Sequence, residues 1–154
     1  MKLKYVKDSI LNTEIEFIAH GVNCQGVMGS GVAKVLFKKY PQVREAYLEY
    51  YMESFPFVLE TSGFLGLVQE VNCGEKTVFN CFTQDNFGYG GEIYGDYEAI
   101  RKCFLTIGED CDITEVAIPK IGCGLAGLDW EIVEGILEEV SEKTGLEITV
   151  YYLE

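Results

Sequence analysis

Two glycine-rich segments carry the residues best suited to chemistry. The first spans residues 23–33 (NCQGVMGSGVA) and the second spans residues 119–130 (PKIGCGLAGLDW). Each follows an apolar stretch typical of a buried strand and precedes a segment with helical spacing. Backbone N–H groups in a glycine loop at a helix N-terminus bind phosphate without any basic side chain. Two such loops at neighbouring strand ends predict a site that clamps a diphosphate.

The first loop does not match the common nucleotide-binding fingerprints. Gly26 and Gly31 have the spacing of a P-loop, but Val32 stands where that motif requires lysine. Lys34 occupies the third glycine position of the dinucleotide fingerprint. The pattern therefore argues against a nucleoside-triphosphate hydrolase and a Rossmann site. Glycines that serve only tight turns remain the alternative.

Two polar residues at the end of the preceding strand are candidates for catalysis. His20 is the only histidine, and its imidazole suits a general acid or base or a group that holds an attacking water. Asn23 can donate to and accept from ribose hydroxyls. A hydrogen-bonded structural histidine and an Asx turn are the respective alternatives. Neither Cys24 nor Cys123 is followed by arginine at the sixth position, which argues against a phosphocysteine route.

Strands and helices alternate along the chain. Hydrophobic periodicity predicts strands over residues 2–7, 14–23, 58–61, 66–73, 77–83, 116–119 and 147–152. Helices are expected from residue 30 to the lysines at 38 and 39, from 41 to about 52, from the cap Asp96 to about 107, and from the cap Asp129 to near Gly145. Residues 84–95 form a long loop, which favours a functional role. This order predicts a mainly parallel sheet with helices on both faces.

Length and charge narrow the class of protein. The chain has 154 residues, of which 48% are hydrophobic, so we expect one domain over residues 1–154. A formal net charge of -13 argues against nucleic-acid polymers as partners. No apolar run is long enough to span a membrane. The six cysteines lack C-x-x-C spacing, so we expect reduced thiols, no metal site, no cofactor and a cytoplasmic location.

The two loops, together with His20-Gly21-Val22-Asn23, resemble the macrodomain family over nearly the whole chain. The resemblance implies a three-layer α/β/α fold with a mixed, mainly parallel central sheet. It also implies ADP-ribose or ADP-ribose 1''-phosphate as the ligand. The second loop is similar to the branch that holds terminal ADP-ribose glycohydrolases, DNA ADP-ribosyl hydrolases and ADP-ribose 1''-phosphate phosphatases.

Individual positions favour the phosphatase group within that branch. Gln84 and Ala126 occupy the places where the glycohydrolases carry a catalytic lysine and acid. The segment Phe82-Thr83 with Phe87-Gly88, and the spacing of His20 from Asn23, look similar to the phosphatases. The resemblance thus implies removal of the terminal phosphate of ADP-ribose 1''-phosphate. The alternatives are a binding module without activity and an ADP-ribosyl hydrolase that lacks the usual lysine.

The expected site residues follow from the loops and the resemblance. His20 and Asn23 are the expected catalytic residues. The expected ligand-binding residues are Ser9, Ile10, Gly29, Ser30, Gly31, Val32, Phe87, Gly122, Cys123, Gly124, Leu125 and Tyr151. Ser9 stands where the family usually has the acid that contacts adenine, so Asp8 or backbone groups are expected to take that role.

Overall fold

A mixed sheet of six strands, in the order β1-β6-β5-β2-β4-β3, runs through the protein. This computed structural model describes residues 2–29, 31–54, 60–88, 92–124 and 126–153. The strands are β1 (Lys4–Lys7), β2 (Phe17–Asn23), β3 (Val68–Asn72), β4 (Thr77–Gln84), β5 (Glu115–Ile118) and β6 (Glu147–Tyr152). All neighbours pair parallel except β3, which lies antiparallel to β4 at the edge. The predicted mixed, mainly parallel sheet is confirmed.

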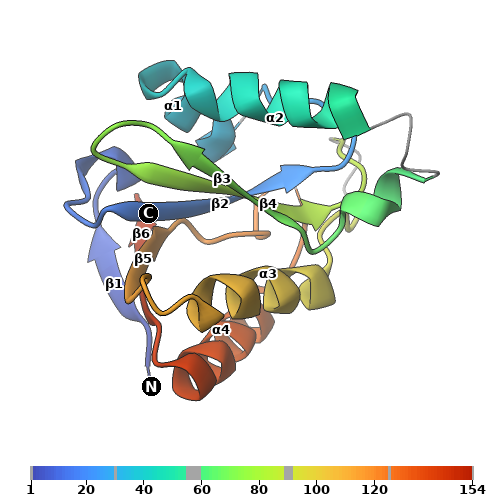
Figure 1. Ribbon diagram of the computed structural model, residues 1–154. Helices are drawn as coiled ribbons and strands as arrows, with labels where there is room; N and C mark the ends of the chain where they lie inside the picture. The colour runs from blue at the N-terminus through green and yellow to red at the C-terminus, as the bar shows by residue number, and fades with distance from the viewer. Residues whose placement is uncertain (1, 30, 55–59, 89–91, 125, 154) are drawn as a thin grey trace.

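Helices cover both faces of this sheet. They are α1 (Gly31–Lys39), α2 (Gln42–Ser54), α3 (Tyr97–Glu109) and α4 (Trp130–Thr144). Figure 1 shows α1 and α2 on one face and α3 and α4 on the other. The three-layer α/β/α arrangement is therefore confirmed.

Each face of the sheet packs its own apolar core. On one side, Leu36 of α1 and Tyr47 of α2 pack with Phe82 of β4. On the other side, Phe104 of α3 and Leu137 of α4 pack with apolar residues of the central strands. Because side chains alternate across a strand, β2 contributes Ile18 to the first core and Ala19 to the second. The twisted sheet therefore lies between two helical layers, each with its own core (Figure 1).

The strand β2 begins later than the sequence predicts. A strand was expected from residue 14, but the structure has β2 from Phe17. The Lys76 ammonium donates to the carbonyls of Thr13 and Ile15 at 2.9 and 2.8 Å. A side chain from elsewhere in the chain therefore takes the acceptors that a strand partner would use.

The expected strand over residues 58–61 is wrong at its last position. Thr61 opens a short 3-10 helix (Thr61–Phe64), and residues 58 and 59 lie outside the described part of the chain. The Thr61 hydroxyl donates to Oδ1 of Asp85 at 2.8 Å. This contact and the turn at Ser62 and Gly63 replace extended pairing.

The helix ends follow the predicted capping residues. Asp96 accepts from the N–H of Ala99 at the start of α3, and Asp129 accepts from the N–H of Glu131 at the start of α4. Gly145 ends α4 in the left-handed conformation, with φ of 81°. Within the described ranges, no helix is long and apolar enough to cross a membrane.

Substitutions at two glycines, one at the end of α4 and one inside it, test whether Gly145 caps the helix. Gly145→Ala is expected to lower the free energy of unfolding by about 1 kcal/mol, because a Cβ disfavours positive φ. Gly135 lies inside α4, and an added Cβ there meets no described atom within 4 Å. Gly135→Ala is therefore expected to raise the free energy of unfolding by about 0.5 to 1 kcal/mol. Chemical denaturation measures the free energy of unfolding of both variants, which should change in opposite directions. Equal changes would contradict the assignment of Gly145 as the C-terminal cap.

Candidate functional site

A cavity of about 650 Å³ opens where the parallel strands end. The first glycine loop follows β2, the second follows β5, and both line this cavity. The ends of β4 and β6 line it as well. The carboxyl ends of parallel strands meet at one edge of a sheet, which is where open α/β sheets bind ligands.

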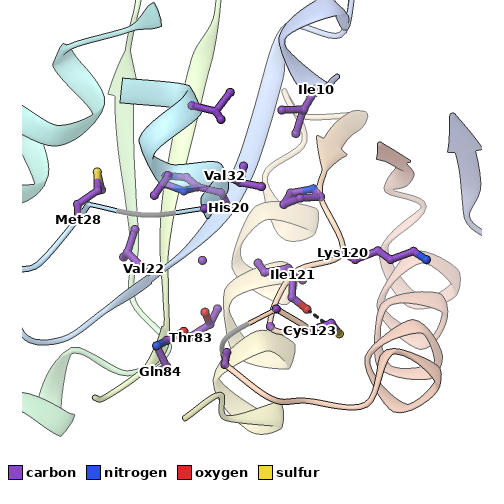
Figure 2. Close-up of a pocket in the computed structure, with 18 of the residues that line it drawn as sticks. Ile10, His20, Val22, Met28, Val32, Thr83, Gln84, Lys120, Ile121 and Cys123 are labelled. Carbon is purple, nitrogen blue, oxygen red and sulfur yellow. Dashed lines mark hydrogen bonds between the residues drawn. The ribbon is translucent and has the colours of Figure 1, made fainter. Parts of the chain in front are cut away.

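The structure brings the described candidate residues together around this cavity. Those that line it are Ser9, Ile10, His20, Asn23, Gly29, Gly31, Val32, Phe87, Gly122, Cys123, Gly124 and Tyr151. Ser30 and Leu125 lie outside the described residues. Figure 2 shows side chains from the two loops and from the ends of β2 and β4 converging on the same space.

The Asn23 side chain holds the first loop in shape. Its Oδ1 accepts from the N–H of Gln25 at 2.9 Å, and its Nδ2 donates to the carbonyl of Val27 at 2.7 Å. The Tyr47 hydroxyl lies 2.9 Å from the same Oδ1. The bond to Gln25 is that of an Asx turn, the alternative that the sequence left open. Both polar atoms of Asn23 are thus engaged within the protein.

His20 belongs to a chain of hydrogen bonds that crosses three strands, buried at His20 and Asn80 and part-buried at Gln69. Its Nε2 lies 2.5 Å from Oδ1 of Asn80 in β4. Nδ2 of Asn80 donates to Oε1 of Gln69 in β3 at 3.0 Å and to the carbonyl of Val43 in α2 at 3.1 Å. Nε2 of Gln69 in turn donates to the carbonyl of Ala46 at 2.8 Å. The chain of bonds therefore starts at the cavity and ends on the backbone of α2.

This network fixes the protonation of the imidazole. Because the amide nitrogen of Asn80 faces Gln69 and Val43, its oxygen must accept, so Nε2 of His20 carries the proton. Nδ1 then presents a lone pair, and within the described part of the chain this buried atom has no hydrogen-bond partner. Burial lowers the pKa of His20 from 6.5 to about 4, although the bond to Asn80 opposes this shift. At neutral pH the imidazole is an uncharged acceptor.

Two neutral residues, Gln84 and Ala126, also face the cavity; the resemblance compares their positions with the catalytic groups of the glycohydrolases. Gln84 and Ala126 both line the cavity, and the Gln84 amide donates to the carbonyl of Asn86 at 2.7 Å.

Burial raises the pKa of the Cys123 thiol to about 11, with nearby Asp129 adding to the effect and Lys120 opposing it. The Cys123 thiol is therefore protonated at neutral pH and is a poor nucleophile.

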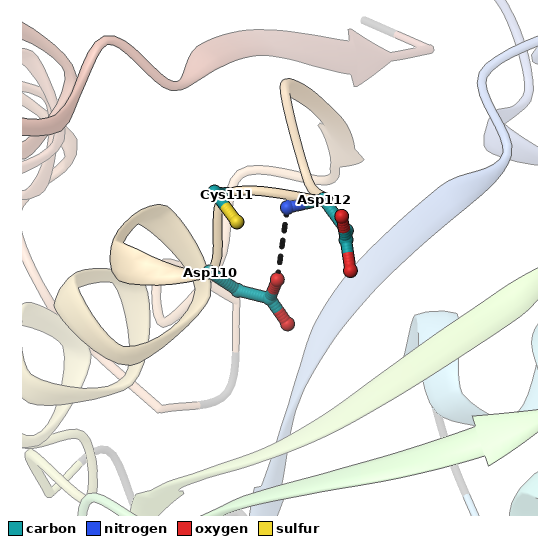
Figure 3. A group of neighbouring side chains, drawn as sticks. All are labelled: Asp110, Cys111 and Asp112. Atoms are coloured by element: carbon teal, nitrogen blue, oxygen red, sulfur yellow. Dashed lines mark hydrogen bonds between the residues drawn. The ribbon is translucent and has the colours of Figure 1, made fainter.

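One group of possible metal ligands lies away from this cavity. Asp110, Cys111 and Asp112 are exposed and bring their ligand atoms within 4.8 Å of one another (Figure 3). They follow α3 and precede β5, at the sheet edge opposite the glycine loops. Oδ1 of Asp110 accepts from the N–H of Asp112 at 2.9 Å, so this carboxylate closes a turn. We assign no metal to this group.

Sequence reasoning gave no role to several residues that line the cavity. Lys120 and Tyr152 are the main ones; Lys120 lies two residues after β5, and Tyr152 is the last residue of β6. A lysine within the second glycine segment of an acidic chain was a signal for Lys120. Tyr152 had no such signal, because only the pairing of β6 with β5 brings it near the loop.

The single histidine makes its protonation directly measurable. In nitrogen NMR spectra of the folded protein, we expect Nε2 protonated, Nδ1 unprotonated and no titration between pH 8 and pH 5, because burial disfavours the charged ring. The same residue in denaturant is the internal control and should titrate near its ordinary pKa of about 6.5. A folded-state midpoint near 6.5, or a proton on Nδ1, would contradict the hydrogen-bond network.

Comparison with known proteins agrees with this geometry. A family model described as Macro domain matches residues 19–137. An uncharacterized 17.5 kDa protein of Enterobacteria phage T4 is 34% identical over 156 residues, covering 97% of this chain and 96% of that protein. Human ADP-ribose glycohydrolase OARD1 is 28% identical, covering 99% and 92%. An ADP-ribose 1''-phosphate phosphatase of Debaryomyces hansenii is 25% identical, covering 99% of each chain.

Solved structures share the fold over nearly the full length. A protein of unknown function from Bacteroides thetaiotaomicron has a TM-score of 0.84 at 30% identity and covers 99% of each chain. The macrodomain of Mycobacterium tuberculosis DarG has a TM-score of 0.79 at 25% identity and covers 97% of each chain. The matched residues include most of β2, both glycine loops and the first half of α4. The chain therefore belongs to the Macro domain family.

Proposed function

We propose that this macrodomain binds an ADP-ribose-type ligand, with its diphosphate between the two glycine loops, and hydrolyses the terminal phosphate of ADP-ribose 1''-phosphate. The relatives named for ADP-ribose chemistry support this ligand class. The observation that carries the proposal is the open space at two glycines of the loops, Gly29 and Gly124.

These two glycines differ from their neighbours in what the fold requires. Gly31 and Gly122 have φ of 62° and 79°, so the backbone conformation alone explains glycine there. Gly29 and Gly124 do not adopt positive φ, and an added Cβ at either meets no described atom within 4 Å. Both line the cavity. Because the fold does not require glycine at these positions, their small size supports close approach of a ligand to the backbone.

Backbone donors are available next to these glycines. Within the described part of the chain, no hydrogen bond uses the N–H groups of Gly29, Gly31, Gly122 or Gly124. The first turn of α1 adds N–H groups that have no acceptor inside the helix. Such donors suit the oxygens of a diphosphate, which need no basic side chain.

The nucleoside half of the ligand fits the other end of the cavity. Ile10 and Tyr151 offer apolar and aromatic surface there, beside Ser9. Oγ of Ser9 accepts from the N–H of Leu11, which leaves its proton free to donate to a base. Oδ1 of Asp8 accepts from the N–H of Ser9 and from Nδ2 of Asn12. We propose that the Ser9 hydroxyl and the remaining Asp8 oxygen contact the base.

In the proposed reaction, His20 acts through its unprotonated Nδ1. That atom would accept a hydrogen bond from the attacking water and orient it toward the terminal phosphorus. The new bond joins the water oxygen to phosphorus, the bond from phosphorus to the ribose oxygen breaks, and a water proton ends on that oxygen. The products are ADP-ribose and inorganic phosphate. Asn23 is a positioning residue, since its side chain holds the first loop.

A second candidate function is ligand binding without catalysis. The neutral residues Gln84 and Ala126, and the hydrogen bonds that Oδ1 and Nδ2 of Asn23 form within the protein, favour it. Both candidate functions require the same cavity and the same backbone donors. Only a measurement of phosphate release therefore distinguishes them.

We also propose a cytoplasmic protein that acts on small molecules. All six cysteines are free, as expected of a reducing compartment. A net charge of -13 repels nucleic-acid backbones and anionic membranes, while leaving backbone donors open to a small nucleotide.

Binding is tested by filling the open positions. Gly29→Ala and Gly124→Ala should each weaken ADP-ribose binding about tenfold or more, because a methyl group occupies ligand space at a cost of about 1 to 3 kcal/mol. Calorimetry gives the affinity and denaturation shows that the fold is kept. Gly135→Ala is the matched control and should bind as the wild type does. Absence of ADP-ribose binding to the wild type would overturn the proposed ligand.

Catalysis is tested by release of inorganic phosphate from ADP-ribose 1''-phosphate. The wild type should release phosphate, and His20→Ala should release it at least about tenfold more slowly, as expected for loss of a group that orients water. Binding without release would overturn the phosphatase and leave the binding module. Unchanged release by His20→Ala would exclude His20 from the reaction.

A further inference from the structure

The long loop that follows β4 contacts both glycine loops. At its start, the N–H of Cys24 donates to the carbonyl of Asp85 at 3.1 Å, which continues the pairing of β2 with β4 by one step. At its end, the N–H groups of Tyr94 and Gly95 donate to the carbonyl of Ala126 at 2.8 and 3.0 Å. This loop is therefore joined to the first glycine loop at one end and to the second at the other.

The Asp85 side chain joins Gln25 of the first glycine loop to the short 3-10 helix. Nε2 of Gln25 donates to Oγ1 of Thr61 at 3.0 Å, to the Asp85 carbonyl at 3.1 Å and to Oδ1 of Asp85 at 3.2 Å. The Thr61 hydroxyl donates to the same Oδ1 at 2.8 Å. Phe64 of this 3-10 helix is buried and stacks on Phe82 of β4, with ring centres 5.3 Å apart. The three polar side chains are thus fastened to the core.

Gln25 is held from two sides. Its backbone N–H donates to Oδ1 of Asn23 at 2.9 Å, while its side chain bonds to Asp85. The chain then passes through Gly26, whose φ of 73° is left-handed, and reaches the cavity lining at residue 27 and at Gly29. The position of the Gly29 backbone therefore depends on how Gln25 is held four residues earlier.

Asp85 itself lies outside the cavity. Among the described residues of its loop, Gln84 and Phe87 line the cavity and Asp85 does not. Its carboxylate is part-buried against Gln25 and Thr61. Asp85 therefore affects a bound ligand through the glycine loop that it holds, and not by direct contact.

We propose that Asp85 is a positioning residue that acts through Gln25 to hold the first glycine loop in the shape that binds the diphosphate. This inference rests on the proposed function, which places the diphosphate between the two loops. Without the carboxylate, the Thr61 hydroxyl loses its acceptor and the Gln25 amide loses one of three. The backbone donors near Gly29 must then be ordered when the ligand binds, and that ordering lowers the affinity.

A double-mutant cycle tests this role, with the affinity for ADP-ribose measured by calorimetry. Asp85→Ala and Gln25→Met should each weaken binding about three- to tenfold, the usual net effect of one hydrogen bond. Gln25→Met leaves the Asp85 and Thr61 side chains bonded to each other, so it breaks the link from the loop side alone. The double variant should bind as the weaker single variant does, because both changes remove the same link.

A conservative variant separates the position of the acceptor from its charge. Both donors to the Asp85 carboxylate are uncharged, and an amide oxygen accepts from them equally well. Asp85→Asn should therefore bind ADP-ribose within about twofold of the wild type, which is less than the loss of one hydrogen bond. A loss in Asp85→Asn equal to that in Asp85→Ala would overturn the positioning role, because it would show that the charge acts on the ligand.

Asp110→Ala is the matched control, since it also removes one carboxylate that closes a turn, at the opposite edge of the sheet. It should bind ADP-ribose as the wild type does, and denaturation should show that each variant is folded. Unchanged affinity in Asp85→Ala, or losses that multiply in the double variant, would overturn the positioning role alone. Failure of the wild type to bind ADP-ribose would overturn the proposed function and the positioning role together.

Discussion

Parallel pairing of the central strands is the constraint on which the site depends. Because β2 pairs parallel with both β4 and β5, and β5 with β6, four strands end at the same edge of the sheet. Each strand then leaves the sheet with backbone groups that its neighbours no longer satisfy. The two glycine loops connect β2 to α1 and β5 to α4. The common direction of the strands therefore determines where the cavity lies, and the side chains determine only its lining.

Most of the fold was predictable because its signals are local. Asp96, Asp129 and Gly145 mark helix ends through contacts with residues a few positions away, and these predictions are confirmed. The errors at residue 14 and at Thr61 have long-range causes. Lys76 bonds to backbone carbonyls 61 and 63 positions earlier in the chain and Asp85 to a hydroxyl 24 positions earlier, and no local sequence pattern predicts such contacts.

The site was predictable in its place but not in its electrostatics. Glycine spacing located both loops, and the structure gathers the described candidates around one cavity. The protonation of His20 depends on Asn80, which is 60 positions away in the chain, and on the orientation that Gln69 and Val43 impose on its amide. The position of Lys120 depends likewise on Tyr152. Both the protonation of His20 and the position of Lys120 depend on the order of the strands, because strands that are neighbours in the sheet are distant in the sequence.

The hydrogen-bond chain from His20 to α2 also affects which strand alignments are possible. Asn80 is the register partner of His20 on one side and of Gln69 on the other. A slip of the edge strand β3 by one residue would place Gln69 on the opposite face and leave a buried amide without its partner. Such a loss costs about 1 to 3 kcal/mol, whereas apolar side chains tolerate neighbouring alignments more readily. The polar chain thus selects a single alignment for an antiparallel edge strand, and contributes to the uniqueness of the native state as well as to the chemistry of the histidine.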